Sequence, residues 1–231
     1  MKRNNGAVIA LLFIAIMVVL LIAQTFKAQN DIEGQTESKL LEKTTTCSSQ
    51  KDICYHNDAN VYHYLDVYLP DDEGPFPAIV YIHGGGWVEG SRKDFEEIAI
   101  LYAERGIAGF SIDYTLTTSN NSGWPQNIRD IVLAIEFIKE NAATYKIDTK
   151  RIILIGTSSG AHLASLVGTL SGHESFLSGL NAQQITGSKI NAVVNYGAVT
   201  DLEYIGENCT FLKVYEIISS AFGNVTYQQN S

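Results

Sequence analysis

The stretch "RIILIGTSSGAHLASL", residues 151–166, decides the fold. It begins with a β-favouring apolar run and ends with helical spacing, so it predicts a strand that turns directly into a helix. Gly156, Ser158 and Gly160 occupy the turn with G-x-S-x-G spacing. A serine on so sharp a turn has strained backbone angles, and the turn closes only if the residues two positions away on each side lack a Cβ atom. The stretch therefore predicts an exposed, nucleophilic Ser158 at the carboxyl edge of a sheet.

Two alternatives exist for this turn. Glycine and serine are common residues, so G-x-S-x-G without its context would also fit an ordinary tight turn. The strand before it and the helix after it favour the nucleophile instead. Ser159 is the nearest rival to Ser158, but it would break the glycine spacing. The new helix would also direct backbone N–H groups and the positive end of its dipole at the site.

A second glycine-rich stretch, "YIHGGGWVEGSRKD" at residues 81–94, follows another apolar run. When a serine attacks an acyl group, an oxygen becomes negative, and each fixed hydrogen-bond donor to it contributes about 3 kcal/mol. Glycines let backbone donors approach closely because no side chain intervenes. We therefore expect the amides of Gly85, Gly86 and Ser159 to form an oxyanion hole. A flexible loop is the alternative interpretation of the three glycines taken alone.

From about residue 55 the chain alternates between strand-like and helix-like segments. Short apolar runs predict strands at residues 64–69, 78–82, 107–112, 151–155 and 191–196. Helical patterns cover residues 94–105, 128–145 and 158–170. In the second helix Ile131, Ile135 and Ile138 mark the apolar face, and Asp130 is expected on the solvent side. The alternation predicts a mostly parallel sheet with helices on both faces.

Composition limits the classes of partner. With 231 residues, 45% of them apolar, the chain can hold one α/β domain and a short appendage. The net charge of −9 and the lack of a long basic run argue against nucleic acid or an anionic membrane surface as the main ligand. No metal-ligand pattern or nucleotide motif is evident, since Gly84, Gly85 and Gly86 lack G-x-G-x-x-G spacing. We expect no metal and no cofactor.

The N-terminus differs from the rest of the chain. Residues 7–23 form an unbroken apolar run preceded by Lys2 and Arg3. This pattern predicts an uncleaved membrane anchor within residues 1–27, with a cleaved export signal as the alternative. The basic residues would stay in the cytoplasm, which places the following domain outside it, either anchored or secreted.

Residues 28–54 are polar and predict a tether between that segment and the domain at residues 55–231. In an exported chain Cys47 and Cys54 could form a small disulfide loop, with Cys209 left over, although free thiols are the alternative. Glycosylation sequons at Asn120, Asn208 and Asn224 suit an exterior location but also arise by chance.

Four motifs carry a resemblance to a known family. In order and spacing, "HGGGWVEGSRKD", "SIDYTL", "WPQNIRDIVLAIEFIKENAATYKIDTKRIILIGTSSGAHLASL" and "INAVVNYGAVTDL" resemble α/β-hydrolase esterases of the hormone-sensitive-lipase-like and feruloyl-esterase or acetylesterase (BD-FAE-like) branch. The turn at Ser158 in the third stretch is called the elbow below. The group also looks like the kynurenine formamidases. The resemblance runs from about residue 55 to the C-terminus and implies the three-layer α/β-hydrolase sandwich.

The resemblance also implies roles for individual residues. Ser158 would be the nucleophile, Gly85 and Gly86 would contribute the oxyanion donors, and His83, Gly84 and Trp87 would belong to the glycine loop. This chain departs from the family pattern at three single positions, where the changes in side-chain type are small or local. Thr115 stands where the family has arginine in "DYRL", and Ser159 and Ala161 stand where it usually has alanine and glycine.

The larger departure concerns the general base. In this fold the order is serine, acid, histidine, and the histidine takes the serine proton. The five histidines are His56, His63, His83, His162 and His173. None follows the last predicted strand, where the family places its histidine, and His162 on the elbow helix is expected to pack. Asp201 follows a strand and is the candidate acid, although the family acid comes one strand later.

Two interpretations follow from different classes of protein. In the first, the chain is a piece of a serine esterase that ends before the acid, the histidine and the last strands. Its parent would hydrolyse a small carboxylic ester, or alternatively an aryl formamide, through an acyl-serine intermediate. In the second, it is a membrane-tethered, non-catalytic relative that binds a partner, or a truncated product. The ester and the oligomeric state stay open.

Overall fold

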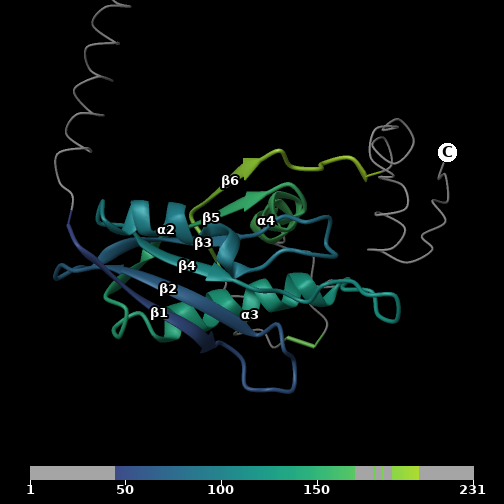
Figure 1. Cartoon of the computed structure of the whole chain (residues 1–231), viewed down its shortest axis with the longest axis horizontal. Coiled ribbons are helices and arrows are strands. Elements are labelled where there is room, and N and C mark those ends of the chain that lie inside the picture. The colour runs from purple at the N-terminus through teal and green to yellow at the C-terminus, as the bar shows by residue number, and fades with distance from the viewer. Residues whose placement is uncertain (1–44, 170–178, 181–183, 185–188, 203–231) are drawn as a thin grey trace, which may run out of the picture. The chain divides into compact units, whose positions relative to one another are not determined.

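The computed structural model describes residues 45–169, 179–180, 184 and 189–202 (Figure 1). Several expectations fall outside these ranges: the anchor at residues 1–27, most of the tether, His173, Cys209, and the sequons at Asn208 and Asn224. Within the ranges that are described, no helix has the length and apolar character needed to cross a bilayer.

Six strands form one sheet. They are β1 (Cys47–Cys54), β2 (Tyr64–Pro70), β3 (Phe76–Ile82), β4 (Ala108–Ile112), β5 (Ile147–Thr157) and β6 (Ala192–Tyr196), in the spatial order β1-β2-β4-β3-β5-β6. Strands β4, β3, β5 and β6 pair in parallel, whereas β2 pairs antiparallel with both β1 and β4. The mostly parallel sheet expected from the sequence is confirmed.

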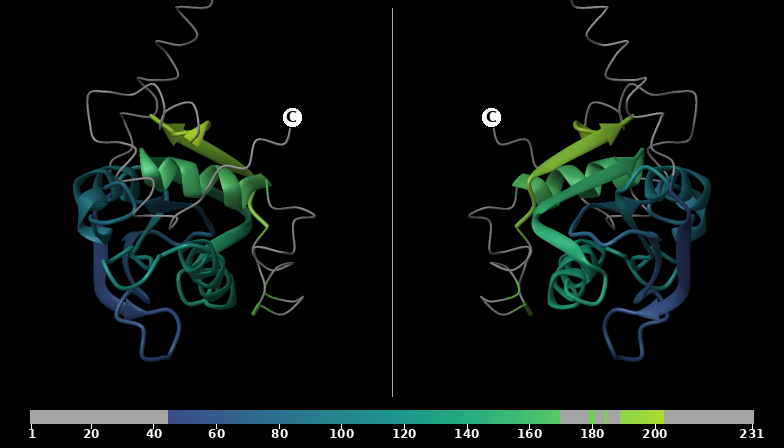
Figure 2. Two further views of the ribbon diagram at one scale, coloured as in Figure 1. Left: turned by 90° about the vertical axis from the view of Figure 1, so that its right-hand side faces the viewer. Right: turned by 90° about the vertical axis from the view of Figure 1, so that its left-hand side faces the viewer.

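Helices cover both faces of this sheet. The helical elements are η1 (Arg92–Phe95), α2 (Glu96–Ala103), α3 (Gln126–Glu140) and α4 (Ser159–Thr169). Alternate residues of β3 explain the arrangement: Val80 and Ile82 belong to the core under α3 and α4, whereas Ile79 and Tyr81 belong to the core under α2. In Figure 1, α2 and α3 lie on opposite sides of the sheet. Figure 2 shows α4 beside β6.

The tether expected at residues 28–54 is wrong at its C-terminal end, because residues 47–54 form β1. This strand was missed since its side chains are mostly exposed and polar, so they give no apolar alternation. Backbone pairing with β2 holds it in place instead.

Of the two alternatives left open for Cys47 and Cys54, the structure shows free thiols rather than a disulfide. They stand at opposite ends of the extended strand, roughly 23 Å apart at about 3.3 Å per residue. A disulfide needs Cα atoms within about 7 Å of each other.

Asp130 on α3 corrects another expectation. Its relative exposure is 0%, so it does not lie on the solvent side of the helix. The apolar stripe of α3 is wide, and Asp130 precedes Ile131 and Val132 within it.

Strand β6 is the edge strand opposite β1 and the last strand among the described residues. It leaves Val194 and Tyr196 exposed.

Candidate active site

Ser158 stands between β5 and α4 with a φ of +51°, in the left-handed region that non-glycine residues rarely adopt. Two backbone hydrogen bonds hold it there. Its N–H donates to the Tyr196 carbonyl of β6 at 2.8 Å, and its own carbonyl accepts from the His162 N–H at 3.1 Å. The residue is exposed. A strained, exposed serine at the carboxyl end of a parallel strand is the arrangement that the G-x-S-x-G spacing predicts.

The two glycines of the motif have separate steric reasons. A Cβ atom on Gly156 would lie 2.4 Å from the Gly160 carbonyl oxygen, so it would block the turn itself. A Cβ atom on Gly160 would lie 2.2 Å from the carbonyl oxygens of both Ile82 and His83, at the end of β3. The steric expectation for both positions is confirmed, and Gly160 additionally joins the elbow to the start of the glycine loop.

The glycine loop is a tight turn with left-handed backbone. Gly85, Gly86 and Trp87 have φ values of 109°, 60° and 64°. The amides of Val88 and Glu89 both donate to the Gly85 carbonyl at 3.1 Å, which closes the turn. This geometry excludes the alternative of an unstructured loop.

A cleft of about 500 Å³ joins the loop to the serine. Its lining consists of Gly84, Gly85, Glu89, Gly90, Asp94, Phe95, Thr157 and Ser158. Gly84 is the point of closest approach, since a Cβ atom there would lie 3.3 Å from the Ser158 Cβ atom. The structure therefore brings Ser158 and Gly85 into one cleft, whereas Gly86 lies just beyond its lining.

Ser159 is buried and is the first residue of α4. Its amide thus belongs to the first helical turn, where N–H groups have no partner within the helix. Together with the Gly85 amide, it is a backbone donor beside Ser158, and its contribution to an oxyanion hole stays a prediction.

Two carboxylates of the cleft were missed from the sequence. Glu89 and Asp94 line it alongside Ser158. They follow the glycines in "GGGWVEGSRKD", but no spacing rule distinguishes them from solvated surface charges. They make this side of the cleft acidic.

His83 has a structural place in the loop. Its ring stacks on Tyr114 with centroids 4.2 Å apart and planes 13° apart, and its Nδ1 lies 2.8 Å from the Gly84 carbonyl oxygen. The Tyr114 hydroxyl donates to the His83 carbonyl at 2.9 Å. Burial lowers the pKa of His83, so the ring is neutral at pH 7.

His162 packs as expected. It is buried on α4 with its ring edge-on to Trp87, with centroids 5.4 Å apart. Burial lowers the pKa of His162 to about 4, which makes it a poor general base at neutral pH.

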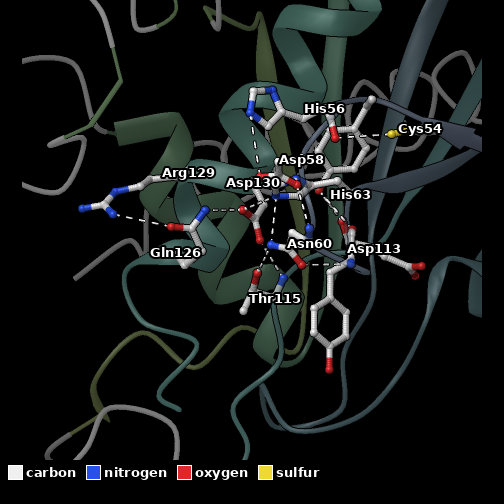
Figure 3. Close-up of polar contacts among 12 residues, drawn as sticks. Cys54, His56, Asp58, Asn60, His63, Asp113, Thr115, Gln126, Arg129 and Asp130 are labelled. Carbon is white, nitrogen blue, oxygen red and sulfur yellow. Dashed lines mark hydrogen bonds and ion pairs between the residues drawn. The ribbon is translucent and has the colours of Figure 1, made fainter.

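His63 is buried between two carboxylates (Figure 3). Its Nδ1 lies 2.8 Å from Asp58 Oδ1 and its Nε2 lies 2.9 Å from Asp130 Oδ1. Burial opposes the charged form, but the hydrogen bonds and charges of Asp130 and Asp58 outweigh it and raise the pKa of His63. The exposed His56 packs edge-on against His63, with ring centroids 5.3 Å apart.

In the described ranges, the ring hydrogen bonds of His63 and His83 go to groups other than the Ser158 hydroxyl. Asp201 is exposed, beyond the end of β6, and its role as the acid stays a prediction. The same ranges contain no cluster of histidine, cysteine and acidic side chains that could hold a metal ion.

The elbow, the glycine loop and the sheet around them lie within a family match. The family model BD-FAE matches residues 65–230, which is more than half of the chain. The chain belongs to the BD-FAE family. Membership fits the mixed sheet with helices on both faces, which is an α/β-hydrolase fold.

Named proteins similar to this BD-FAE chain include several esterases. Probable isoprenylcysteine alpha-carbonyl methylesterase ICMEL1 of Oryza sativa subsp. japonica is 35% identical over 102 residues, which cover 44% of this chain and 24% of that protein. A bifunctional GH43-CE protein of Bacteroides eggerthii is 36% identical with a TM-score of 0.59, over 67% of this chain and 21% of that one. Thermogutta terrifontis esterase 2, phosphonylated by sarin, is 25% identical with a TM-score of 0.62, over 75% and 63% of the two chains. The BD-FAE chain spans about a quarter of the length of the curated relatives it matches.

The first prediction concerns Gly160. Gly160→Ala should lower the free energy of unfolding by about 3 kcal/mol or more, because the added Cβ atom meets two backbone carbonyls that cannot move independently. Urea unfolding followed by circular dichroism measures the loss. Thr169→Ala, at the exposed end of the same helix, is the control and should change stability by less than about 0.5 kcal/mol. Equal stability of both variants would contradict the close packing at Gly160.

The second prediction concerns the pH dependence of stability. Because the folded-state pKa of His63 is raised, its contribution is fully present below the unfolded pKa of about 6.5 and is lost as pH rises through the folded pKa. The stability difference between the wild type and His63→Gln should therefore shrink from pH 6 to pH 9. Urea unfolding across that range measures it, and a difference that grows with pH would contradict the assignment.

Proposed function

We propose that this chain forms part of a serine esterase that hydrolyses small carboxylic esters through an acyl intermediate on Ser158. The observation that carries the proposal is the position of Ser158, strained and exposed at the elbow, beside Gly84 and Gly85 in one cleft. Membership of the BD-FAE family supports the same reaction.

The reaction has two stages. The Ser158 hydroxyl oxygen attacks the ester carbonyl carbon, a general base takes the hydroxyl proton, and the carbonyl oxygen becomes negative. The amides of Gly85, Gly86 and Ser159 are the proposed donors to that oxygen. The carbon–oxygen bond to the alcohol then breaks, and the alcohol leaves with the proton. Water attacks the acyl-serine in the same way, which releases the carboxylic acid and restores the serine.

The general base is proposed to come from outside the described residues, in a protein longer than this chain. Its supports are that the curated relatives are roughly two to three times as long as this chain and that the described histidines are placed elsewhere. Asp201 is the candidate acid within the described part. A serine nucleophile with a general base and backbone donors carries out this hydrolysis without a metal ion or a cofactor.

The surroundings of the domain are also part of the proposal. Residues 1–27 would anchor the chain in a membrane or serve as a cleaved export signal, followed by a polar tether that ends before β1 at Cys47. The apolar run and the preceding Lys2 and Arg3 support this arrangement, with the domain outside the cytoplasm.

A non-catalytic binding protein is the second candidate. The placement of three described histidines favours it. His63 and His83 are buried in contacts of their own, and the low pKa of His162 makes that residue a poor general base. An oxyanion hole with an unactivated serine gives only residual catalysis.

The third prediction separates the two candidates. The full chain should react with a fluorophosphonate probe at Ser158 at least about a hundredfold more slowly than a complete serine esterase, because the general base is proposed to lie outside these residues. Intact-mass measurement over hours gives the rate, and peptide mapping gives the residue. Thermogutta esterase 2 phosphonylated by sarin supports the choice of a phosphorus probe.

Two variants control this experiment. Ser158→Ala should abolish labelling, whereas Ser159→Ala should retain it because the proposed donor at that position is the backbone amide. Labelling that persists in Ser158→Ala would overturn the nucleophile assignment. Labelling as fast as a complete esterase would show that a base lies within these 231 residues. Complete inertness of the wild type would favour the binding protein.

A further inference from the structure

Asp130 carries a carboxylate into the core, where an unpaired charge would be costly. Three donors from separate parts of the chain surround it (Figure 3). The Thr115 amide donates to its Oδ2 at 2.7 Å, and Gln126 Nε2 and His63 Nε2 lie 2.7 and 2.9 Å from its Oδ1. The carboxylate therefore fixes the backbone at Thr115, and His63 supplies the nearest positive charge when protonated.

Thr115 lies in residues 113–117, which follow β4 and are named here the clamp segment. Further hydrogen bonds of Thr115 and Thr117 also fix the clamp segment. The Thr115 hydroxyl accepts from Asn60 Nδ2 at 2.9 Å, and the Thr117 hydroxyl accepts from the Gly123 amide at 2.9 Å. A Cβ atom on Gly123 would lie 2.8 Å from the Thr115 carbonyl oxygen, so the chain packs closely on both sides.

The clamp segment contacts the glycine loop at three places. At the start of the loop, Tyr114 stacks on the His83 ring and donates to the His83 carbonyl at 2.9 Å. In the middle, the Thr117 amide donates to the Trp87 carbonyl at 2.8 Å.

The third contact is at the end of the loop. There the Asp113 carboxylate accepts from the Arg92 amide at 2.6 Å and pairs with the Arg92 guanidinium. The clamp segment thus spans the whole loop that carries Gly84, Gly85 and Gly86.

We propose that Asp130 is a positioning residue for the oxyanion loop: through the Thr115 amide it holds the clamp segment, which in turn holds residues 83–92 against Ser158. The inference rests on the proposed function, since it assigns Asp130 to the same reaction. It also explains why a carboxylate lies buried among the apolar residues of α3. An apolar side chain at this position could not accept from Thr115, Gln126 and His63.

The fourth prediction tests this role with Asp130→Asn in the full chain. Asparagine keeps the shape but turns one acceptor oxygen into a donor, so at least one of the three hydrogen bonds is lost. We expect amides in residues 83–92 to exchange hydrogen faster. The limiting rate of Ser158 phosphonylation by the fluorophosphonate should fall about tenfold or more, while the probe concentration for half-maximal rate changes less than about twofold.

Two further variants separate positioning from general stability. Ile138→Val removes one methyl group from the same helix without touching the clamp segment, and it should leave exchange and labelling rate within about twofold. Gln126→Ala removes one donor from Asp130 at a partly exposed position and should act as a weaker Asp130→Asn. It keeps the test decisive where Asp130→Asn does not fold.

The outcomes are distinguishable. Unchanged exchange in residues 83–92 in both Asp130→Asn and Gln126→Ala would overturn the positioning role. The role would also be overturned if Asp130→Asn lost no more labelling rate than Ile138→Val, when the two variants have equal melting temperatures. If the wild type and Ser158→Ala are labelled at the same rate, the proposed function is overturned instead. The exchange measurement would still decide the role of Asp130.

Discussion

The close approach of Gly160 to the end of β3 is the constraint on which the site depends. Two carbonyl oxygens, of Ile82 and His83, occupy the space that a side chain at Gly160 would need. Because α4 begins one residue earlier, this contact sets the distance between the elbow and the glycine loop. Ser158 and Gly85 share a cleft as a consequence, although 73 positions separate them in the sequence (158 minus 85).

Much of this arrangement could be predicted from local sequence rules. All five expected strands are present. The parallel strands β3 and β4 are buried on both faces, which is why they read as apolar runs. The elbow was predictable because its geometry admits only glycine at Gly156 and Gly160. Strand β1 was not, since polar exposed side chains give no period and its order comes from pairing with β2.

The polar core around α3 shows the other limit of sequence analysis. Helical periodicity distinguishes apolar from polar positions, but it cannot tell a buried carboxylate from an exposed one. Besides Gln126, one turn earlier on the same helix, Thr115 and His63 donate to Asp130 from other parts of the chain, and contacts from so far along the sequence give no local signal. The acidic lining at Glu89 and Asp94 was missed for another reason: both side chains are exposed, and no spacing rule distinguishes them from other surface charges.

The described part of the chain thus contains the proposed nucleophile, Ser158, and the proposed backbone donors of a hydrolase site. Everything proposed for this site depends on Ser158 facing the glycine loop in a reactive geometry. A crystal structure of the Ser158–phosphonate adduct tests that geometry most directly. We expect the phosphonyl oxygen about 3 Å from the amide nitrogens of Ser159 and of Gly85 or Gly86. A phosphonyl oxygen directed into solvent, with those amides bonded elsewhere, would contradict it.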